Sequence, residues 1–182
     1  MKAFVHEGIQ GIAGTYLREH KELDPKENEV RVRMKYAGVN HRDLFVLDRH
    51  ALTDPPLVIG SDGAGIIELV GTAVSDFKVG DEVIINPSLR WLQKTDAPPV
   101  DFEILGLPDD GTLAKKVVIS SDNIERKREH LSWEEAGVLS LAALTAYRAL
   151  FTQAEVNPTD TILLPGIGGG ERSRFYYYLL RR

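Results

Sequence analysis

A glycine turn near the carboxyl end of the chain carries the most specific chemistry in the sequence. Residues 161–165 are a short apolar run, and Gly166, Gly168 and Gly169 stand in the turn that follows it. Glycines after a strand let the backbone approach a pyrophosphate, whose oxygens bind the amides at the start of the next helix. The pattern predicts the opening of a dinucleotide-binding βαβ unit. The alternative is a plain flexible terminus.

The residues after this turn do not fit the rest of such a unit. A dinucleotide-binding unit continues with an amphipathic helix, a second strand and a ribose-reading residue about 20 positions further on. Residues 171–182 instead hold four arginines and three consecutive tyrosines. We interpret 171–182 as a tail foreign to the fold, produced by a frameshift or an artificial end. Cofactor binding by this chain alone is expected to be weak or absent.

Composition bounds the class of protein and its partners. The chain has 182 residues, 43% of them apolar and 27% charged, with a net charge of −5 and no cysteine. These values are typical of a globular protein and exclude disulfides, thiolate metal sites and a cysteine nucleophile. The acidic balance argues against nucleic acid as a partner. Because no apolar run resembles a membrane span or a signal peptide, we expect a cytoplasmic protein without a membrane partner.

The first 120 residues carry mostly strand signals. Residues 29–36 alternate polar and apolar side chains, which predicts a strand with one buried face. Further strand candidates, separated by Gly and Asp turns, are residues 64–70, 82–86 and 111–119. Short strands with such turns are typical of a sandwich or barrel. Residues 87–108 contain four prolines and are predicted to be a long surface excursion.

The pattern changes after residue 130. Ser132 and Glu135 form a capping box, and a run rich in Ala and Leu predicts a helix from there to about residue 151. Residues 157–160 are a predicted turn, and the strand at residue 161 follows. We therefore divide the chain into a β-rich domain at 1–130 and a linking helix with the start of a second domain at 131–170.

Five motifs occur in an order that resembles the medium-chain dehydrogenase/reductase superfamily. They lie at residues 37–44, 56–65, 79–83, 143–150 and 166–170, so that the resemblance covers residues 1–170. It implies a mainly β (α+β) fold. Residues 1–130 would form a GroES-like, partly open β-barrel with peripheral helices. The first strand and glycine turn of an incomplete Rossmann domain would follow.

The resemblance also implies where a catalytic zinc would be bound. Zinc-binding members place a Cys, a His with an acidic neighbour, and a further ligand such as Cys at fixed positions of this motif order. Those positions match, in this chain, Asn40, Ser61, Asp62 and Leu141. Leucine has no lone pair, and amide and hydroxyl groups are poor zinc ligands beside thiolate or imidazole. We expect no zinc and predict no metal site; a zinc-type alcohol dehydrogenase stays an alternative by family label.

The subgroup without zinc is similar to quinone oxidoreductases and enoyl-thioester reductases. It implies hydride transfer from NADP or NAD to a small carbonyl, quinone or enone substrate, with the protein orienting the cofactor and excluding water. As it stands, the chain is expected to be inactive. Two other hypotheses are a non-enzymatic GroES-like barrel that binds a partner through residues 87–108, and a damaged copy without function. We expect a monomer or a non-native dimer.

Two residues are the catalytic candidates. In zinc-free relatives an Asn at the position of Asn40 faces nicotinamide and substrate, and its amide can bond a carbonyl on which charge develops. Asn40 can equally be a helix N-cap. Asp62 is the second candidate, with the alternative that it ends the turn at residues 56–60. The resemblance puts Arg42 where zinc enzymes have a proton-relay hydroxyl, but an arginine cannot relay protons near neutral pH. Asp43 is expected to be a structural partner of a neighbouring helix or loop.

Cofactor binding is assigned to five residues. His41 matches a position near the pyrophosphate, or is an ordinary surface histidine. Thr145 matches a threonine near the nicotinamide, or is a helical threonine bonded back to a carbonyl. The glycine-turn candidates are Gly166, Gly168 and Gly169.

Overall fold

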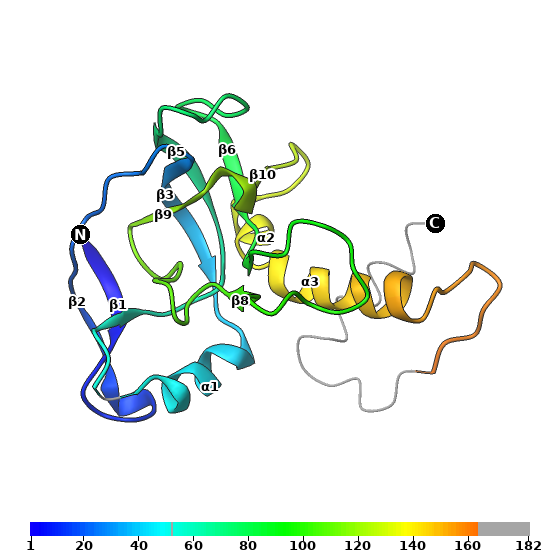
Figure 1. Ribbon diagram of the computed structural model, residues 1–182, viewed down its shortest axis with the longest axis horizontal. Helices are drawn as coiled ribbons and strands as arrows, with labels where there is room; N and C mark the ends of the chain where they lie inside the picture. The colour runs from blue at the N-terminus through cyan, green and yellow to red at the C-terminus, as the bar shows by residue number, and fades with distance from the viewer. Residues whose placement is uncertain (52, 164–182) are drawn as a thin grey trace.

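The structure is a computed structural model that describes residues 1–51 and 53–163. It consists mainly of antiparallel strands, with helices at the periphery (Figure 1). The glycine turn with Gly166, Gly168 and Gly169, and the tail 171–182, lie outside the described residues.

A five-stranded sheet forms the centre of the molecule. In spatial order its strands are β10 (Ile124–Arg126), β6 (Glu82–Ile85), β5 (Asp62–Val70), β3 (Glu29–Gly38) and β9 (Lys116–Ser120). Strand β3 confirms the prediction from alternation, because Val30 and Val32 point into the core while Arg33 is exposed. The main core gathers apolar side chains from all five strands, among them Ile67, Val83 and Ile85. This sheet supplies a rigid base at one end of which the candidate site lies.

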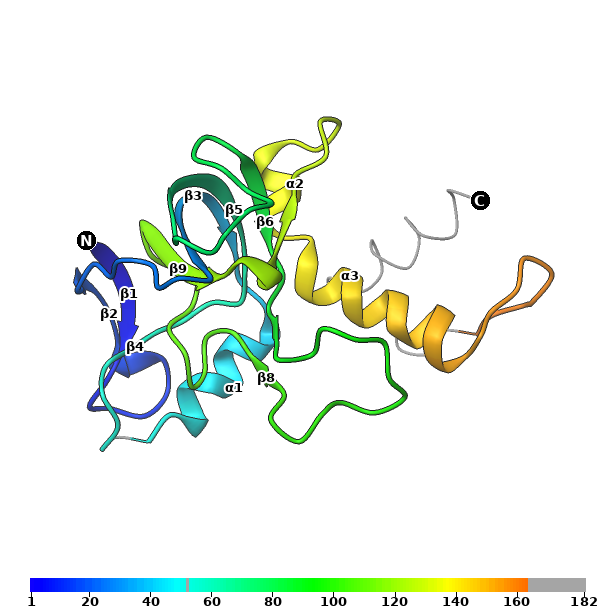
Figure 2. The same cartoon turned by 45° about the horizontal axis from the view of Figure 1, so that its top comes forward.

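Two smaller sheets complete the β-rich part. One has the order β2 (Thr15–Glu19), β1 (Lys2–His6) and β4 (Leu57–Val58), and the other pairs β7 (Ser88–Leu89) with β8 (Glu103–Ile104). A bridge between Ala3 and Ala114 joins β1 to the segment that leads into β9. The sheets curve around one another but stay open, as Figure 2 shows. This is the expected partly open, GroES-like architecture.

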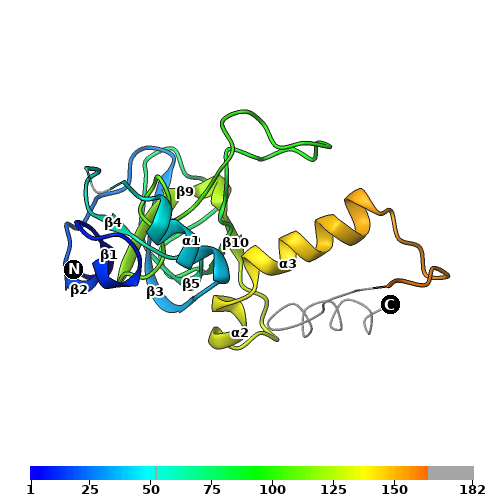
Figure 3. The same cartoon turned by 90° about the horizontal axis from the view of Figure 1, so that it is seen from below.

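The helices lie at the edges of the sheets. They are η1 (Ile12–Gly14), α1 (His41–Arg49), η2 (Ser121–Asn123), α2 (Trp133–Gly137), α3 (Ser140–Tyr147) and the π-helical turn η3 (Arg148–Gln153). Helix α2 packs against β3 and β5, whereas α3 and η3 run on away from the sheets (Figure 3).

The predicted strand at 111–119 is wrong in its first half. Strand β9 begins only at Lys116, and residues 111–113 pair instead with residues 58–60. Gly111 approaches Gly60 so closely that an added Cβ would lie 2.1 Å from the Gly60 carbonyl oxygen. The segment crosses from one sheet to another at this contact.

The predicted helix at 132–151 is interrupted. The capping box is confirmed, because the Ser132 hydroxyl accepts from the Glu135 N–H and the Glu135 carboxylate accepts from the Ser132 N–H. The helix then breaks after Gly137, where an added Cβ would lie 2.7 Å from the Cβ of Tyr36. This close approach to β3 ends α2 and lets α3 leave in a new direction.

Residues 87–108 are the predicted long excursion, mostly exposed and closed at its base by the short pair β7 and β8. Residues 161–163 form no strand in the described part of the chain, and Leu163 is 86% exposed there. A strand needs a neighbouring backbone to pair with, and the described residues place none beside this run. The turn before it is confirmed by a hydrogen bond from the Asp160 N–H to the Asn157 carbonyl oxygen.

Candidate functional site

Asn40 stands where β3 ends and α1 begins. It is the N-cap residue of α1, with extended backbone angles of φ −115° and ψ 158°. The Asp43 carboxylate accepts from the Asn40 N–H at 2.7 Å, and the Asp43 N–H donates to the Asn40 carbonyl oxygen at 2.9 Å. The predicted N-cap position of Asn40 and the structural role of Asp43 are both present. The backbone of Asn40 is therefore fixed by the start of its own helix.

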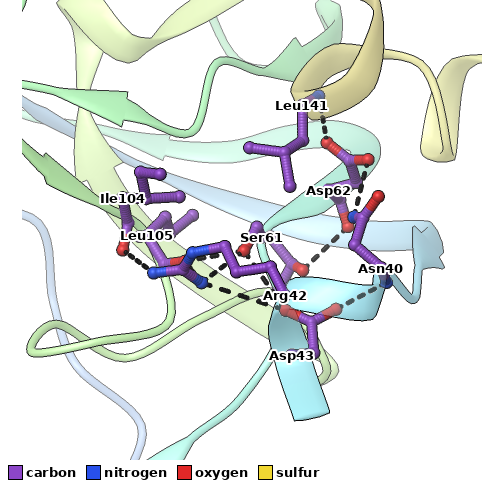
Figure 4. A network of polar contacts seen from close by, with 9 residues as sticks. Asn40, Arg42, Asp43, Ser61, Asp62, Ile104, Leu105 and Leu141 are labelled. Atoms are coloured by element: carbon purple, nitrogen blue, oxygen red, sulfur yellow. Dashed lines mark hydrogen bonds and ion pairs between the residues drawn. The ribbon is translucent and has the colours of Figure 1, made fainter. Parts of the chain in front are cut away.

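The side chain of Asn40 is fixed by Asp62. Asp62 begins β5 and is fully buried. One of its carboxylate oxygens accepts from the Asn40 side-chain amide at 3.0 Å, and the other accepts from the backbone N–H of Leu141 at 2.7 Å (Figure 4). Both carboxylate oxygens accept hydrogen bonds here, and the bond from Asn40 decides which way its side-chain amide points. Asp62 thus joins α1, β5 and the start of α3.

Arg42 and Ser61 extend this cluster toward β8. The Arg42 guanidinium donates to the Ser61 hydroxyl at 2.9 Å and to the carbonyl oxygens of Ile104 and Leu105 at 2.9 and 3.2 Å (Figure 4). The Ser61 hydroxyl also lies 2.9 Å from the Leu105 carbonyl oxygen. Sequence reasoning assigned Arg42 no partner. Its length and its place in the first turn of α1 were the available signal, but backbone carbonyls leave no mark in a sequence.

Burial sets the electrostatics of the Arg42–Asp43 pair. Burial raises the pKa of Asp43, and the bond from the Asn40 N–H, the charge of Arg42 and the Ser61 hydroxyl act in the opposite direction. Burial likewise lowers the pKa of Arg42, which the charge of Asp43 opposes. Their closest charged atoms are 3.9 Å apart. The two groups compensate each other's removal from water, which keeps a buried cation tolerable at this place.

The four residues at the zinc positions of the resemblance come together in this cluster. Asn40 and Leu141 both bond to Asp62, and Ser61 precedes it in the chain. The spatial grouping expected from the resemblance is thus present. The groups bind one another and Arg42 through hydrogen bonds rather than pointing lone pairs at a shared point.

His41 and Thr145 lie near the cluster on exposed faces. His41 is the first residue of α1, and its ring stacks on Phe45 with 5.6 Å between ring centroids. The Thr145 hydroxyl donates to the Leu141 carbonyl oxygen at 2.7 Å, which is the back-bonded geometry of a helical threonine. The oxygen of that hydroxyl keeps lone pairs that can still accept a hydrogen bond.

A cavity of about 890 Å³ opens elsewhere in the β-rich part. Its lining comes from the segments 20–29, 54–57, 105–110 and 118–123, among others, and includes Leu57 and Leu107. None of Asn40, Asp62, His41 and Thr145 lines it. The polar cluster, rather than this cavity, holds the groups that could bond a reacting carbonyl, so we take the cluster as the candidate site.

Fold and site together define a class of protein: a GroES-like β-rich domain whose polar cluster lies where a helix leaves the sheets. The alcohol dehydrogenase GroES-like domain family matches residues 26–129. A zinc-type alcohol dehydrogenase-like protein of Schizosaccharomyces pombe is 37% identical over 179 residues, covering 93% of this chain and 50% of that protein. The chain belongs to the alcohol dehydrogenase GroES-like domain family, within the medium-chain dehydrogenase/reductase superfamily.

Two solved structures have the same fold. An NAD-dependent alcohol dehydrogenase superposes with a TM-score of 0.89 at 33% identity, covering 98% of this chain and 55% of that one. The quinone oxidoreductase from Coxiella burnetii gives a TM-score of 0.76 at 25% identity, covering 96% and 51%. The chain spans about half the length of these relatives. The relatives are oxidoreductases, and the family as a whole is associated with a nicotinamide cofactor. Among the described residues, no helix has the length and apolar content to cross a membrane.

Proposed function

We propose that this chain is the substrate-side half of a nicotinamide-dependent reductase that acts without zinc on a small carbonyl, quinone or enone. The observation that carries the proposal is the Asn40 amide held by the buried Asp62 at the point where α3 leaves the sheets. A bound nicotinamide would supply the hydride in such an enzyme. NADP and NAD both remain candidates, and the cytoplasm is the expected compartment.

Asn40 is the group we assign to the substrate. Its amide nitrogen has two N–H donors, and the bond to Asp62 uses one of them. The second N–H is available for a substrate carbonyl oxygen, where a fixed donor stabilises the negative charge that develops during reduction. Asp62 then acts as a positioning residue, because each of its oxygens already accepts a protein hydrogen bond.

His41 and Thr145 are proposed cofactor contacts. Both are exposed and lie on helices that start at the cluster, where a nucleotide bound by a second domain would meet this one. Gly166, Gly168 and Gly169 complete the proposed set. We propose a monomer or a non-native dimer for the chain alone.

The donor set does not fit zinc. Among the four positions only Asp62 offers a strong oxygen ligand, and its two oxygens are bonded to the Asn40 amide and the Leu141 N–H. The guanidinium of Arg42, bonded to Ser61, adds a positive charge beside the position where a second cation would bind. The guanidinium and a zinc ion would repel each other, so we propose that no reaction step in this family member passes through zinc.

The alternative of a partner-binding barrel has less support. Such a module would need a mobile apolar loop, and residues 87–108 were its candidate. Arg148 and Gln153 hold the carbonyl oxygens of Thr95 and Asp96 in that segment. A loop that is hydrogen-bonded to a helix of its own chain is held in place and does not offer the mobile segment that partner binding would need.

The test is a chimera that joins residues 1–163 to the nucleotide-binding half of a zinc-free relative. We expect NADPH- or NADH-dependent reduction of a quinone or enone that survives treatment with a strong zinc chelator. Asn40→Ala should lower kcat by about 100-fold, the order of magnitude for one lost oxyanion donor. The exposed Asn28 is the matched control, and Asn28→Ala should leave kcat unchanged.

Activity that disappears with the chelator and returns with Zn²⁺ would refute the zinc-free proposal. Equal kcat values for Asn40→Ala and Asn28→Ala would remove Asn40 from the reaction. The 182-residue chain by itself should not oxidise NADPH with either substrate class, and turnover by the purified chain would show that no further domain is needed.

A further inference from the structure

The segment that follows β7 and runs through β8 is held at two places by two arginines. We call residues 90–105 the strap. At its base, Arg42 on α1 donates to the carbonyl oxygens of Ile104 and Leu105. At its tip, Arg148 on η3 donates to the carbonyl oxygens of Thr95, at 3.0 Å, and of Asp96. In Figures 1 and 2 the strap reaches from the β-rich part to the helix that leaves it.

The tip is held by more than these two bonds. The Arg148 guanidinium lies over the Trp91 ring, 4.4 Å from its centroid. Gln153, further along η3, donates to the Asp96 carbonyl oxygen at 3.2 Å. Trp91 in turn meets Phe102 edge to face, with 5.0 Å between ring centroids. The planar guanidinium can bond two carbonyls while it stacks on an indole, which a lysine ammonium cannot do.

These contacts close a ring through the candidate site. Helix α3 begins with the Leu141 N–H on Asp62 and leads directly into η3, which carries Arg148. From its tip at Arg148 the strap leads back to Ile104 and Leu105. The Arg42 guanidinium donates to the carbonyl oxygens of both residues and also to the Ser61 hydroxyl. Ser61 is the neighbour of Asp62 in the chain. Every link in the ring is therefore a hydrogen bond or a continuous stretch of backbone.

We propose that Arg148 is a positioning residue for the Asn40–Asp62 pair, acting through the strap and through α3. The inference rests on the proposed function of that pair. Helix α3 bonds Asp62 through the Leu141 N–H, and the strap is bonded by Arg42 next to the pair. Helix α3 and the strap are joined to each other at Arg148. When that joint opens, α3 loses its link to the strap but keeps the Leu141 bond to Asp62, so that its angle to the sheet can change. The direction of the Asn40 amide then changes with the angle of α3, because Asp62 bonds both.

The experiment uses the 182-residue chain, without cofactor or substrate, in a Trp133→Phe background. Trp91 is then the only tryptophan, since the sequence contains two. Two signals are followed: the accessibility of Trp91 to a neutral fluorescence quencher, and the NMR resonances of the Asn40 side-chain NH₂, identified by their loss in Asn40→Ala. The variants are Arg148→Ala, Arg148→Lys and Gln153→Ala. The control is Arg128→Ala, whose exposed side chain makes no hydrogen bond or ion pair in the described residues.

Arg148→Ala should expose Trp91 to the quencher and shift the Asn40 NH₂ resonances. Arg148→Lys should restore part of both signals, because the charge over Trp91 is kept while the two-carbonyl grip is lost. Gln153→Ala should give smaller changes in the same direction, and Arg128→Ala none. Gln153→Ala and Arg148→Lys also keep the test decisive if Arg148→Ala fails to fold.

Exposure of Trp91 with unchanged Asn40 resonances would overturn the proposal, since Arg148 would then hold only the strap. Unchanged signals in every variant would overturn the ring itself. Because neither signal needs turnover, these failures are distinct from a failure of the proposed reaction, which only the chimera assay reports.

Discussion

Strand β5 and helix α3 meet at Asp62, and the two sides of this joint are built differently. On the sheet side, Ile67, Val83 and Ile85 are at most 1% exposed and pack in the main core. On the helix side, Leu144 and Tyr147 are 42% and 52% exposed. The sheet is stabilised by apolar burial. Helix α3 buries Ala143 and Ala146 but exposes these two larger side chains, and polar contacts at Leu141 and Arg148 link it to the candidate site and the strap. We therefore expect stability to depend mainly on the sheet, and site geometry mainly on these polar contacts.

The largest effect is expected in the main core. Ile67→Ala should lower the free energy of unfolding by about 2–5 kcal/mol, because it removes a fully buried side chain and leaves a cavity. Leu69→Ala, two residues along the same strand but 37% exposed, is the matched control and should cost much less. Denaturant unfolding followed by circular dichroism measures both. Equal losses for the two variants would break the contrast between the buried and the exposed positions of β5.

The strands of this core were the part of the fold that the sequence predicted best. Alternation at residues 29–36 located β3, and the capping box located the start of α2 because both signals are local. The break after Gly137 was missed, since it comes from contact with Tyr36, which is distant in the chain. Of the strand predicted from residue 161, residues 161–163 have no strand conformation and the rest lies outside the described residues.

The candidate site was predicted in the same uneven way. Motif order identified Asn40, Ser61, Asp62 and Leu141 as corresponding positions, and Asn40 is the N-cap of α1. The hydrogen bonds from Arg42 and Arg148 to the strap could not be predicted from the sequence. Both arginines bond carbonyl oxygens, which every residue has, so only the path of the chain decides which carbonyls lie within reach.

The second largest effect is expected at the joint itself. Asp62→Ala leaves the Asn40 amide and the Leu141 N–H without their acceptor, and each unsatisfied buried donor costs about 1–3 kcal/mol. We expect a loss in unfolding free energy in that range or slightly above it, together with faster hydrogen exchange at the Leu141 N–H. Asp122→Ala is the control, because Asp122 is exposed and its carboxylate makes no bond in the described residues. Slow exchange at Leu141 in the Asp62 variant would mean that core packing, not Asp62, holds α3.

A smaller effect is expected from a buried histidine pair in the sheet region. His6 and His50 are 0% and 4% exposed, and their Nδ1 atoms lie 2.9 Å apart. Burial lowers the pKa of His6, and the neighbouring His50 lowers it further, while the carbonyls of Gly11 and Ile9 and the Asp48 carboxylate act in the opposite direction. Below pH 6.5 the unfolded His6 therefore binds a proton that the folded state resists.

The sign of the pH dependence follows from this difference. Where the unfolded state binds more protons, stability rises with pH, so folding stability should fall as the pH drops below 6.5 toward the folded pKa of His6. His6→Gln should flatten the dependence of Tm on pH in that window, and the exposed His130→Gln should not. Comparison with the parent chain cancels the contribution of Asp43, which both share. An unchanged slope in His6→Gln would show that His6 is protonated equally in both states.

The smallest effect is expected on the exposed side of α3, where the helix side of the comparison is most directly tested. Leu144→Gln should change the unfolding free energy by at most about 0.5 kcal/mol, the range of ordinary surface substitutions. Ala143→Gln, at the next position but only 7% exposed, should cost clearly more because a longer polar side chain must enter a packed space. Sedimentation over a range of concentrations adds a second readout, since an exposed leucine contributes to self-association. If Leu144→Gln were as damaging as Ala143→Gln, this face of α3 would be buried in solution. The direction of the helix would then depend on apolar packing rather than on Asp62 and Arg148.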